Sequence, residues 1–137
     1  MKKYLLALLL PILLACDNEG SNNNNPYIPN YSFSYDINTN LPLYNQLTFA
    51  GNAVYIGDIG ARGVYVFNTG SGYNAFDAAC PNQELSSCST MTQNGIYAVC
   101  DCDGAQYSFY TGISEGQSYP MKQYRVQVNG ASIRVYN

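Results

Sequence analysis

Four cysteines in the second half of the chain are the residues whose types and spacing best suit chemistry: Cys80, Cys88, Cys100 and Cys102. Their thiolates could bind zinc or an iron–sulfur cluster, and in an oxidising compartment the same residues pair as disulfides. The Cys-x-Cys spacing of Cys100 and Cys102 is tighter than zinc sites usually have. A disulfide between those two would close a small, strained ring. The count and spacing therefore leave disulfides and a thiolate metal site both open, and four cysteines allow three pairings.

The chain contains no histidine. This absence excludes Ser-His-Asp and Cys-His catalysis, histidine metal sites and the usual proton switch near neutral pH. We therefore expect no enzyme.

The first fifteen residues have the pattern of an export signal. Lys2 and Lys3 precede an apolar stretch that is too short to span a bilayer as a helix. The stretch ends in Leu13-Leu14-Ala15-Cys16, which resembles a bacterial lipobox. The resemblance implies cleavage before Cys16 and acylation of that cysteine, with palmitate or a similar chain. Membrane lipid is then the first expected partner, at the inner membrane, the outer membrane or the cell surface.

Residues 16–30 are rich in Asn, Gly, Ser and Pro and predict a flexible tether. Without Lys2 and Lys3, four of the six basic residues remain, against nine acidic ones, a net charge of −5. A chain this acidic, with scattered cations, is not expected to bind nucleic acid.

Residues 31–137 have a period-two pattern that predicts β-strands. Tyr31, Phe33, Tyr35 and Ile37 alternate with polar residues. Further short runs follow at 53–56, 64–67, 73–79, 96–100, 106–110, 124–128 and 131–136. Asn129-Gly130 between the last two is a strong hairpin signal. We expect an all-β domain of about nine short antiparallel strands, a sandwich or small barrel. Residues 81–94 and 101–105 have no strand pattern and predict two cysteine-bearing loops.

The two loops contain Cys80-Pro81-Asn82 and Cys100-Asp101-Cys102-Asp103-Gly104. This pattern resembles the Rieske [2Fe–2S] domain superfamily, and the resemblance covers about residues 31–137. It implies that Cys80, Asn82, Cys100 and Asp103 stand at the four cluster-ligand positions, with Asn82 and Asp103 where the family has histidines. It also implies that Cys102 matches a disulfide cysteine of the second loop, with Cys88 as its partner.

Replacement of both histidines excludes a standard Rieske cluster, because two neutral imidazoles set the properties of that cluster. Three alternatives remain. The favoured one has disulfides Cys80–Cys100 and Cys88–Cys102 and no cofactor. The second is a four-thiolate zinc or iron–sulfur site, and the third is a residual [2Fe–2S] cluster on Cys80, Cys100 and Asp103.

Three further groups of residues are candidates for the surface, although most tyrosines are expected to be half-buried strand residues and the loop carboxylates to be solvated. Tyrosines near the tether could form an exposed stripe: Tyr27, Tyr31 and Tyr35. Acidic side chains on the two loops could bind calcium: Glu84, Asp101 and Asp103. Basic residues alternating across the last hairpin are expected on a solvent face: Lys122, Arg125 and Arg134.

The sequence therefore predicts a lipoprotein of the bacterial cell envelope with a degenerate Rieske-like domain. Its expected role is a structural or interaction module for an unknown envelope protein or polymer. One alternative is an electron carrier resembling Rieske ferredoxin subunits, with an atypical cluster. A second alternative is a glycan- or peptide-binding module.

Overall fold

The computed structural model describes residues 24–137, so the signal pattern and Cys16 lie outside the described residues. Within this part the elements are β1 (Ser34–Asn38), η1 (Asn45–Thr48), β2 (Ala53–Ile56), β3 (Val64–Asn68), β4 (Tyr73–Asp77), β5 (Thr92–Asn94), β6 (Tyr97–Val99), β7 (Gln106–Ser108), β8 (Gln123–Asn129) and β9 (Ser132–Tyr136). The predicted all-β class is confirmed. Between residues 24 and 137, no helix has the length and apolar character needed to cross a bilayer.

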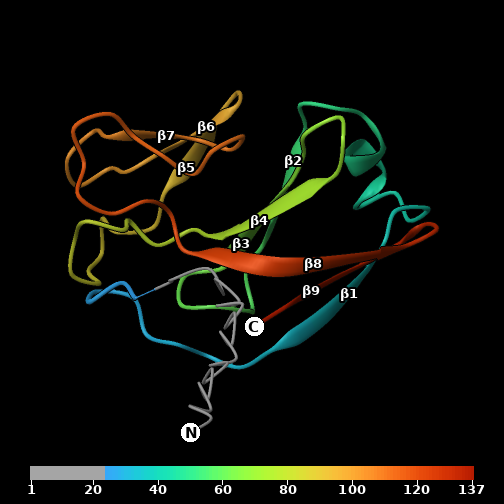
Figure 1. The fold of residues 1–137 in the computed structure, drawn as a ribbon, viewed down its shortest axis with the longest axis horizontal. Coiled ribbons are helices and arrows are strands. Elements are labelled where there is room, and N and C mark those ends of the chain that lie inside the picture. Colours follow the sequence, from blue (N-terminus) through green and yellow to red (C-terminus); the bar gives the residue numbers. More distant parts are fainter. Residues whose placement is uncertain (1–23) are drawn as a thin grey trace, which may run out of the picture.

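The strands form two antiparallel sheets. The large sheet has six strands in the order β1-β9-β8-β4-β3-β2, and it curls into a half-barrel (Figure 1). The small sheet has three strands in the order β5-β6-β7 and lies at one end of the large sheet (Figure 1). The first and last strands of the domain are neighbours, because β1 pairs with β9.

The last hairpin forms as predicted, but its turn is one residue further along. Asn129 pairs with Ser132, so Gly130 and Ala131 are the central turn residues. Gly130 has a φ of 60°, in the left-handed region that glycine adopts without a steric penalty. A glycine at the first central position is typical of a type II′ hairpin turn, which matches the twist of the flanking strands.

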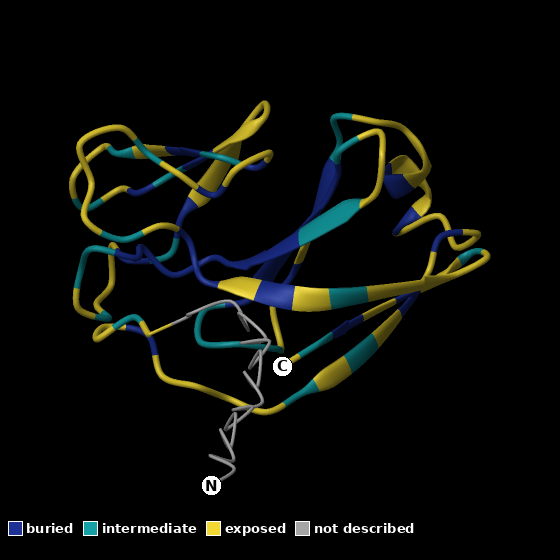
Figure 2. Cartoon of the chain, in the orientation of Figure 1, coloured by how far each residue is buried: buried dark blue, intermediate teal, exposed yellow. Residues whose placement is uncertain are grey.

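Strand β3 is buried on both faces and separates two apolar cores. Tyr65 and Phe67 point into the core under the small sheet, whereas Val64 and Val66 point into the core of the half-barrel. This double burial explains why residues 64–67 read as one continuous apolar run. Strands β1 and β8 alternate between exposed and covered residues, since one of their faces meets solvent (Figure 2).

Two strand assignments differ from the prediction by more than two residues. Strand β1 begins at Ser34 and not at Tyr31. Strand β5 lies inside the segment 81–94, which was expected to contain no strand. All three residues of β5 are exposed and polar, so no apolar periodicity marks it. It forms because its backbone pairs with β6.

The prediction that Lys122 lies on a solvent face is wrong. Lys122 is 2% exposed, and its Nζ donates to the Pro29 carbonyl oxygen at 3.4 Å and to Asn30 Oδ1. Burial lowers the pKa of this ammonium group, and the nearby negative charge of Asp77 opposes the change. Arg125 and Arg134 are exposed as expected.

The stretch that precedes β1 packs on the domain, although the sequence assigned residues 16–30 to a flexible tether. Ile28 is 3% exposed. Asn25 Nδ2 donates to the Pro81 carbonyl oxygen at 2.7 Å, and Pro29 and Asn30 accept hydrogen bonds from Lys122. Residues 25–30 therefore belong to the folded unit, because one apolar side chain and a buried cation fix a segment that is otherwise polar.

We expect the variant Ile28→Ala to lower the free energy of unfolding by about 2–4 kcal/mol, since it removes a buried side chain. The matched control is Ile113→Ala, because Ile113 is 60% exposed and its truncation should cost less than about 0.5 kcal/mol. Urea unfolding of both variants measures the difference. Equal losses would mean that residues 25–30 do not pack on the domain in solution.

Candidate functional site

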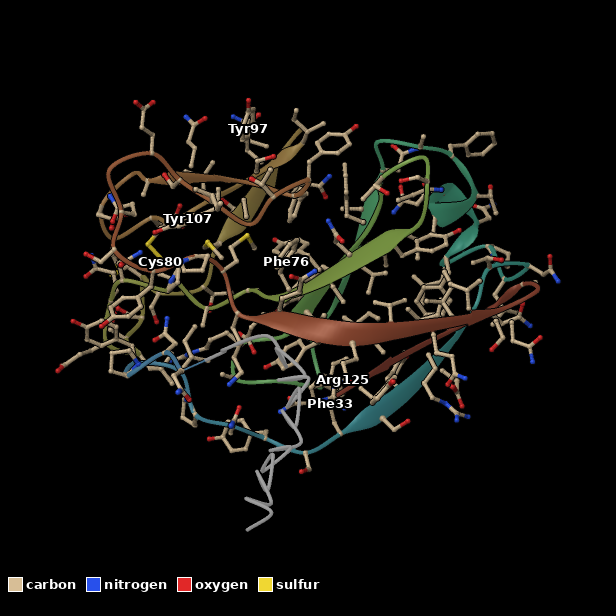
Figure 3. The ribbon with its side chains drawn as sticks, in the orientation of Figure 1. Phe33, Phe76, Cys80, Tyr97, Tyr107 and Arg125 are labelled. Carbon is tan, nitrogen blue, oxygen red and sulfur yellow. A yellow bond between two sulfur atoms is a disulfide. The ribbon has the colours of Figure 1, made fainter. Side chains whose placement is uncertain are left out.

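Two loops contain the four cysteines, and each follows directly from a strand. The first cysteine loop, residues 80–91, follows β4 after Ala78 and Ala79. The second cysteine loop, residues 100–105, is the turn between β6 and β7. The first loop starts from the large sheet and the second belongs to the small sheet. The candidate site therefore lies where the two sheets meet, near Cys80 and Tyr107 (Figure 3).

Two disulfides join the loops. Cys80 is bonded to Cys100 with their Cα atoms 5.6 Å apart, and Cys88 is bonded to Cys102 with their Cα atoms 5.1 Å apart. This is the pairing of the favoured alternative, of which the Rieske resemblance itself implies only the Cys88–Cys102 bridge. The bridged residues are 20 and 14 positions apart. Bridges of that span each stabilise a fold by about 3 kcal/mol when the effect is treated as lost entropy of the unfolded chain.

The two bridges differ in exposure. Cys80 and Cys100 are fully buried in the core under the small sheet. Cys88 is exposed, and Cys102 is half-buried and packs against that same core. A reagent in solvent can therefore reach the Cys88–Cys102 bridge but not the Cys80–Cys100 bridge.

Local hydrogen bonds fix the geometry of both loops. In the first loop, Ser89 Oγ accepts from the backbone N–H of Ser86 and donates to its carbonyl oxygen. This turn holds Cys88 toward the second loop. In the second loop, the N–H of Gly104 donates to the Cys100 carbonyl oxygen at 2.7 Å. Gly104 has a φ of 74°, so a glycine is favoured at this turn.

Asp77 anchors the start of the first loop, and sequence reasoning missed it. Its buried carboxylate accepts from three backbone N–H groups, those of Ala61, Arg62 and Ala79, at 2.6–3.2 Å. It also accepts from the Tyr124 hydroxyl at 2.7 Å. Four donors satisfy a charge that would be costly to bury alone. The available signal was an acidic residue that interrupts the apolar run of residues 75–80.

The two residues at the histidine positions form hydrogen bonds within the protein. Asn82 Nδ2 donates to the Tyr107 hydroxyl and to the Tyr119 carbonyl oxygen, both at 2.9 Å. Asn82 Oδ1 accepts from the backbone N–H of Tyr119. Asp103 accepts from Gln83 Nε2 at 2.9 Å, which links the two loops, and from the N–H of Ala105. Both side chains therefore serve loop structure.

Three sulfur atoms gather at the site. The Sγ atoms of Cys80, Cys100 and Cys102 lie within 4.8 Å of one another. Over residues 24–137, this is the one group of three or more Cys, Asp or Glu side chains close enough to share a metal ion. The third member is thus Cys102 and not Asp103. The acidic calcium site suggested on Glu84, Asp101 and Asp103 does not assemble within the described chain.

The residues present do not fit a [2Fe–2S] cluster of the Rieske type. The two cysteines at ligand positions, Cys80 and Cys100, are bonded to each other and have no free thiolate. Asn82 and Asp103 replace the imidazoles, and their polar atoms are engaged by neighbouring loop residues. A metal ion would find thiolate ligands here only after reduction of the bridges.

The suggested tyrosine stripe is incomplete. Tyr27 and Tyr31 are exposed, but Tyr35 is half-buried and its hydroxyl shares a hydrogen bond with the Tyr44 hydroxyl at 2.7 Å. Tyr27 contacts the ring of Tyr119 edge-on, with centroids 6.1 Å apart. Tyr27 and Tyr35 therefore make intramolecular contacts, and the three tyrosines do not form one exposed stripe.

No family model matches the chain, and no curated protein matches it. Among solved structures, the chain is similar to one from a complex of reduced oxygenase and oxidized ferredoxin in carbazole 1,9a-dioxygenase. The identity is 18% and the TM-score 0.49, over 77% of this chain and 92% of that one.

Two further structures are similar at the same level. The ferredoxin of carbazole 1,9a-dioxygenase from Nocardioides aromaticivorans is 21% identical, with a TM-score of 0.46, over 66% of this chain and 88% of the ferredoxin. A putative NADH-dependent nitrite reductase small subunit from Mycobacterium tuberculosis is 16% identical, with a TM-score of 0.48, over 79% and 97%. These similarities concern the arrangement of strands and do not extend to function.

The Asp77–Tyr124 contact predicts how stability depends on alkaline pH. Burial raises the pKa of Tyr124 above its usual value of 10.0, and the charge of Asp77 and the hydrogen bond to it add to the rise. Burial likewise raises the pKa of Tyr65 and of Tyr107. Above about pH 10 the unfolded chain releases these phenolic protons while the folded chain keeps them.

We therefore expect the free energy of unfolding to fall as the pH rises above 10, by about 1.4 kcal/mol per pH unit for each such tyrosine. The variant Tyr124→Phe should be less stable at neutral pH but should show a smaller alkaline slope by about one tyrosine. Lys122 does not produce this fall, because its lowered pKa makes stability rise with pH up to its unfolded value. Urea unfolding at several alkaline pH values measures both slopes, and equal slopes would contradict the assignment.

Proposed function

We propose that the chain is a lipid-anchored protein of the bacterial cell envelope whose β domain is a structural or interaction module without a catalytic role. Two disulfides take the place of the cluster that the Rieske resemblance implies. The carrying observation is the direct, buried bond between Cys80 and Cys100, the two cysteines at cluster-ligand positions. A bond between the ligands leaves no thiolate for iron.

Exposed apolar side chains support an interaction role. The side chains of Phe49 and Ile113 are more than half exposed, and those of Tyr97 and Tyr110 are also exposed. Tyr97 belongs to the small sheet and points outward from it (Figure 3). The two tyrosines offer a flat apolar surface with a polar tip, and Phe49 and Ile113 add apolar area, which suits a protein or polymer partner. The same residues favour the glycan- or peptide-binding alternative.

A second candidate function is electron transfer by an atypical cluster. The observation that favours it is the group of three sulfur atoms, Cys80, Cys100 and Cys102. If both bridges were open, these atoms would be thiols in one small volume, and thiolates are the usual ligands of iron–sulfur clusters.

Metal content and intact mass separate the two functions. We expect a soluble form comprising residues 17–137, purified after secretion, to be colourless, free of metal and four hydrogens lighter than the fully reduced chain, because two bridges form. The same form made in a reducing cytoplasm is the control for cluster loading. Stoichiometric iron with a visible absorption band in either preparation would replace the structural role by electron transfer.

The lipid anchor is tested on the full-length chain in a bacterium fed with radiolabelled palmitate. We expect label on the wild-type protein and its recovery with membranes, because the 13–16 segment reads as a lipobox. The variant Cys16→Ser should carry no label, and Cys88→Ser is the matched control that should keep it. Unlabelled wild-type protein in the soluble fraction would show that residues 1–15 act as an ordinary export signal.

A further inference from the structure

Cys102 is the one residue that connects the exposed bridge to the buried bridge. It is bonded to Cys88, yet its Sγ lies within 4.8 Å of the Sγ atoms of both Cys80 and Cys100. Cys88 does not belong to this group. A thiolate released at position 102 would therefore start close to a second disulfide, whereas a thiolate released at position 88 would not.

We propose that the Cys88–Cys102 bridge is redox-active and that Cys102 passes the exchange on to the buried Cys80–Cys100 bridge. The reductant is a dithiol, and the protein accepts two electrons from it. The proposal rests on the two-disulfide state of the proposed function. It adds to that state a reaction that a purely structural pair of bridges would not perform.

The first step takes place at the exposed sulfur. One thiolate of the dithiol attacks Cys88 Sγ, a sulfur–sulfur bond forms between them, and the Cys88–Cys102 bond breaks with its electron pair leaving on Cys102. Attack at Cys88 is favoured over attack at Cys102, because Cys88 is exposed and Cys102 is half-buried. The product is a mixed disulfide at Cys88 and a thiolate at Cys102.

A hydroxyl group is in place to assist that step. Ser86 Oγ lies 3.3 Å from Cys88 Sγ and 3.8 Å from Cys102 Sγ. A disulfide sulfur carries no proton, so the hydroxyl is the donor. As the bond breaks, negative charge collects on Cys102, and a hydrogen bond to a charged sulfur is stronger than one to a neutral sulfur.

The second step moves the exchange inward. The Cys102 thiolate attacks Cys80 Sγ, a Cys80–Cys102 bond forms, and the Cys80–Cys100 bond breaks with its electron pair leaving on Cys100. Attack on Cys100 Sγ would instead join Cys100 to Cys102 in a small, strained ring. The route through Cys80 avoids that ring.

The second thiol of the dithiol completes the transfer of two electrons to the protein. Its thiolate attacks the mixed disulfide, forms the internal disulfide of the dithiol and releases Cys88 as a thiolate. Cys88 and Cys100 then take up the two protons that the dithiol loses. The dithiol is oxidised by two electrons, one protein disulfide is reduced, and the remaining bridge is Cys80–Cys102. The exposed carboxylates of Asp101 and Asp103 flank Cys102, so a dithiol that carries no acidic group besides its thiols suits the site better than one that carries carboxylates.

We call this transfer of the exchange from the exposed bridge to the buried bridge the relay. A pair of matched variants tests it in the secreted protein of residues 17–137. Cys88→Ser leaves Cys102 as a free thiol beside the buried bridge, and Cys102→Ser leaves Cys88 free. Each variant is unfolded in guanidinium at mildly acidic pH with N-ethylmaleimide present, so that buried thiols such as Cys100 are also alkylated before they can exchange. It is then cleaved before Asp101 and after Glu84. These cuts place Cys80, Cys100 and Cys102 on separate peptides.

In Cys88→Ser we expect alkylated Cys100 at about a tenth or more of the alkylated Cys102 level, together with a Cys80–Cys102 linked peptide. That ratio corresponds to an exchanged bridge no more than about 1.4 kcal/mol less stable than the original one. In Cys102→Ser we expect alkylation at Cys88 alone, with Cys80–Cys100 intact. Alkylation of Cys102 alone in the first variant would overturn the proposal.

The wild-type protein gives an independent result if either variant fails to fold. It is treated with one equivalent of dithiothreitol, then unfolded and alkylated in the same way, and mapped. The relay predicts label on Cys88 and Cys100 with a Cys80–Cys102 link, whereas reduction of the exposed bridge without relay gives label on Cys88 and Cys102. Failure of the proposed function is distinct, because it would show as bound iron or four free thiols before any reductant is added.

Discussion

The Cys80–Cys100 bridge joins two sheets that share no backbone ladder. Each strand of the small sheet has only three residues, and two of the three strands have only one fully buried residue each, Ala98 and Tyr107. A sheet this small is not stable by itself in water. Its position therefore depends on the core beneath it and on the two bridges that fix the β6–β7 turn to the chain leaving β4. The two disulfides and the core beneath the small sheet therefore fix the geometry of the cysteine loops.

The large sheet is the rigid part to which the small sheet is attached. Strand β3 fills both cores, so neither face of the central strands can shift without disturbing packed side chains. At the end of β4, the Asp77 carboxylate binds backbone N–H groups on both sides of the strand end and the hydroxyl of Tyr124 on β8. Cys80 follows three residues later, and so the first loop begins from a fixed point.

The same arrangement separates two kinds of sulfur chemistry. Burial protects the Cys80–Cys100 bridge from reagents in solvent, and exposure leaves Cys88 open to them. Cys102 lies between these two environments, bonded to one sulfur and close to two others. Asn82 and Asp103 complete the loops by hydrogen bonds.

Sequence alone determined the β class, the last hairpin and the two cysteine loops, because period-two alternation and turn residues are local signals. It left the cysteine pairing open. The Rieske resemblance implied the Cys88–Cys102 bridge, and Cys80–Cys100 was favoured only because two cysteines that bind one iron lie close together. Sequence alone did not reveal the polar strand β5 or the burial of Lys122, since both depend on segments distant in the chain: β6 completes one, and residues 29–30 cover the other. The place of Cys102 beside two bridges was likewise decided by tertiary structure, because distances between loops arise only when the two sheets pack.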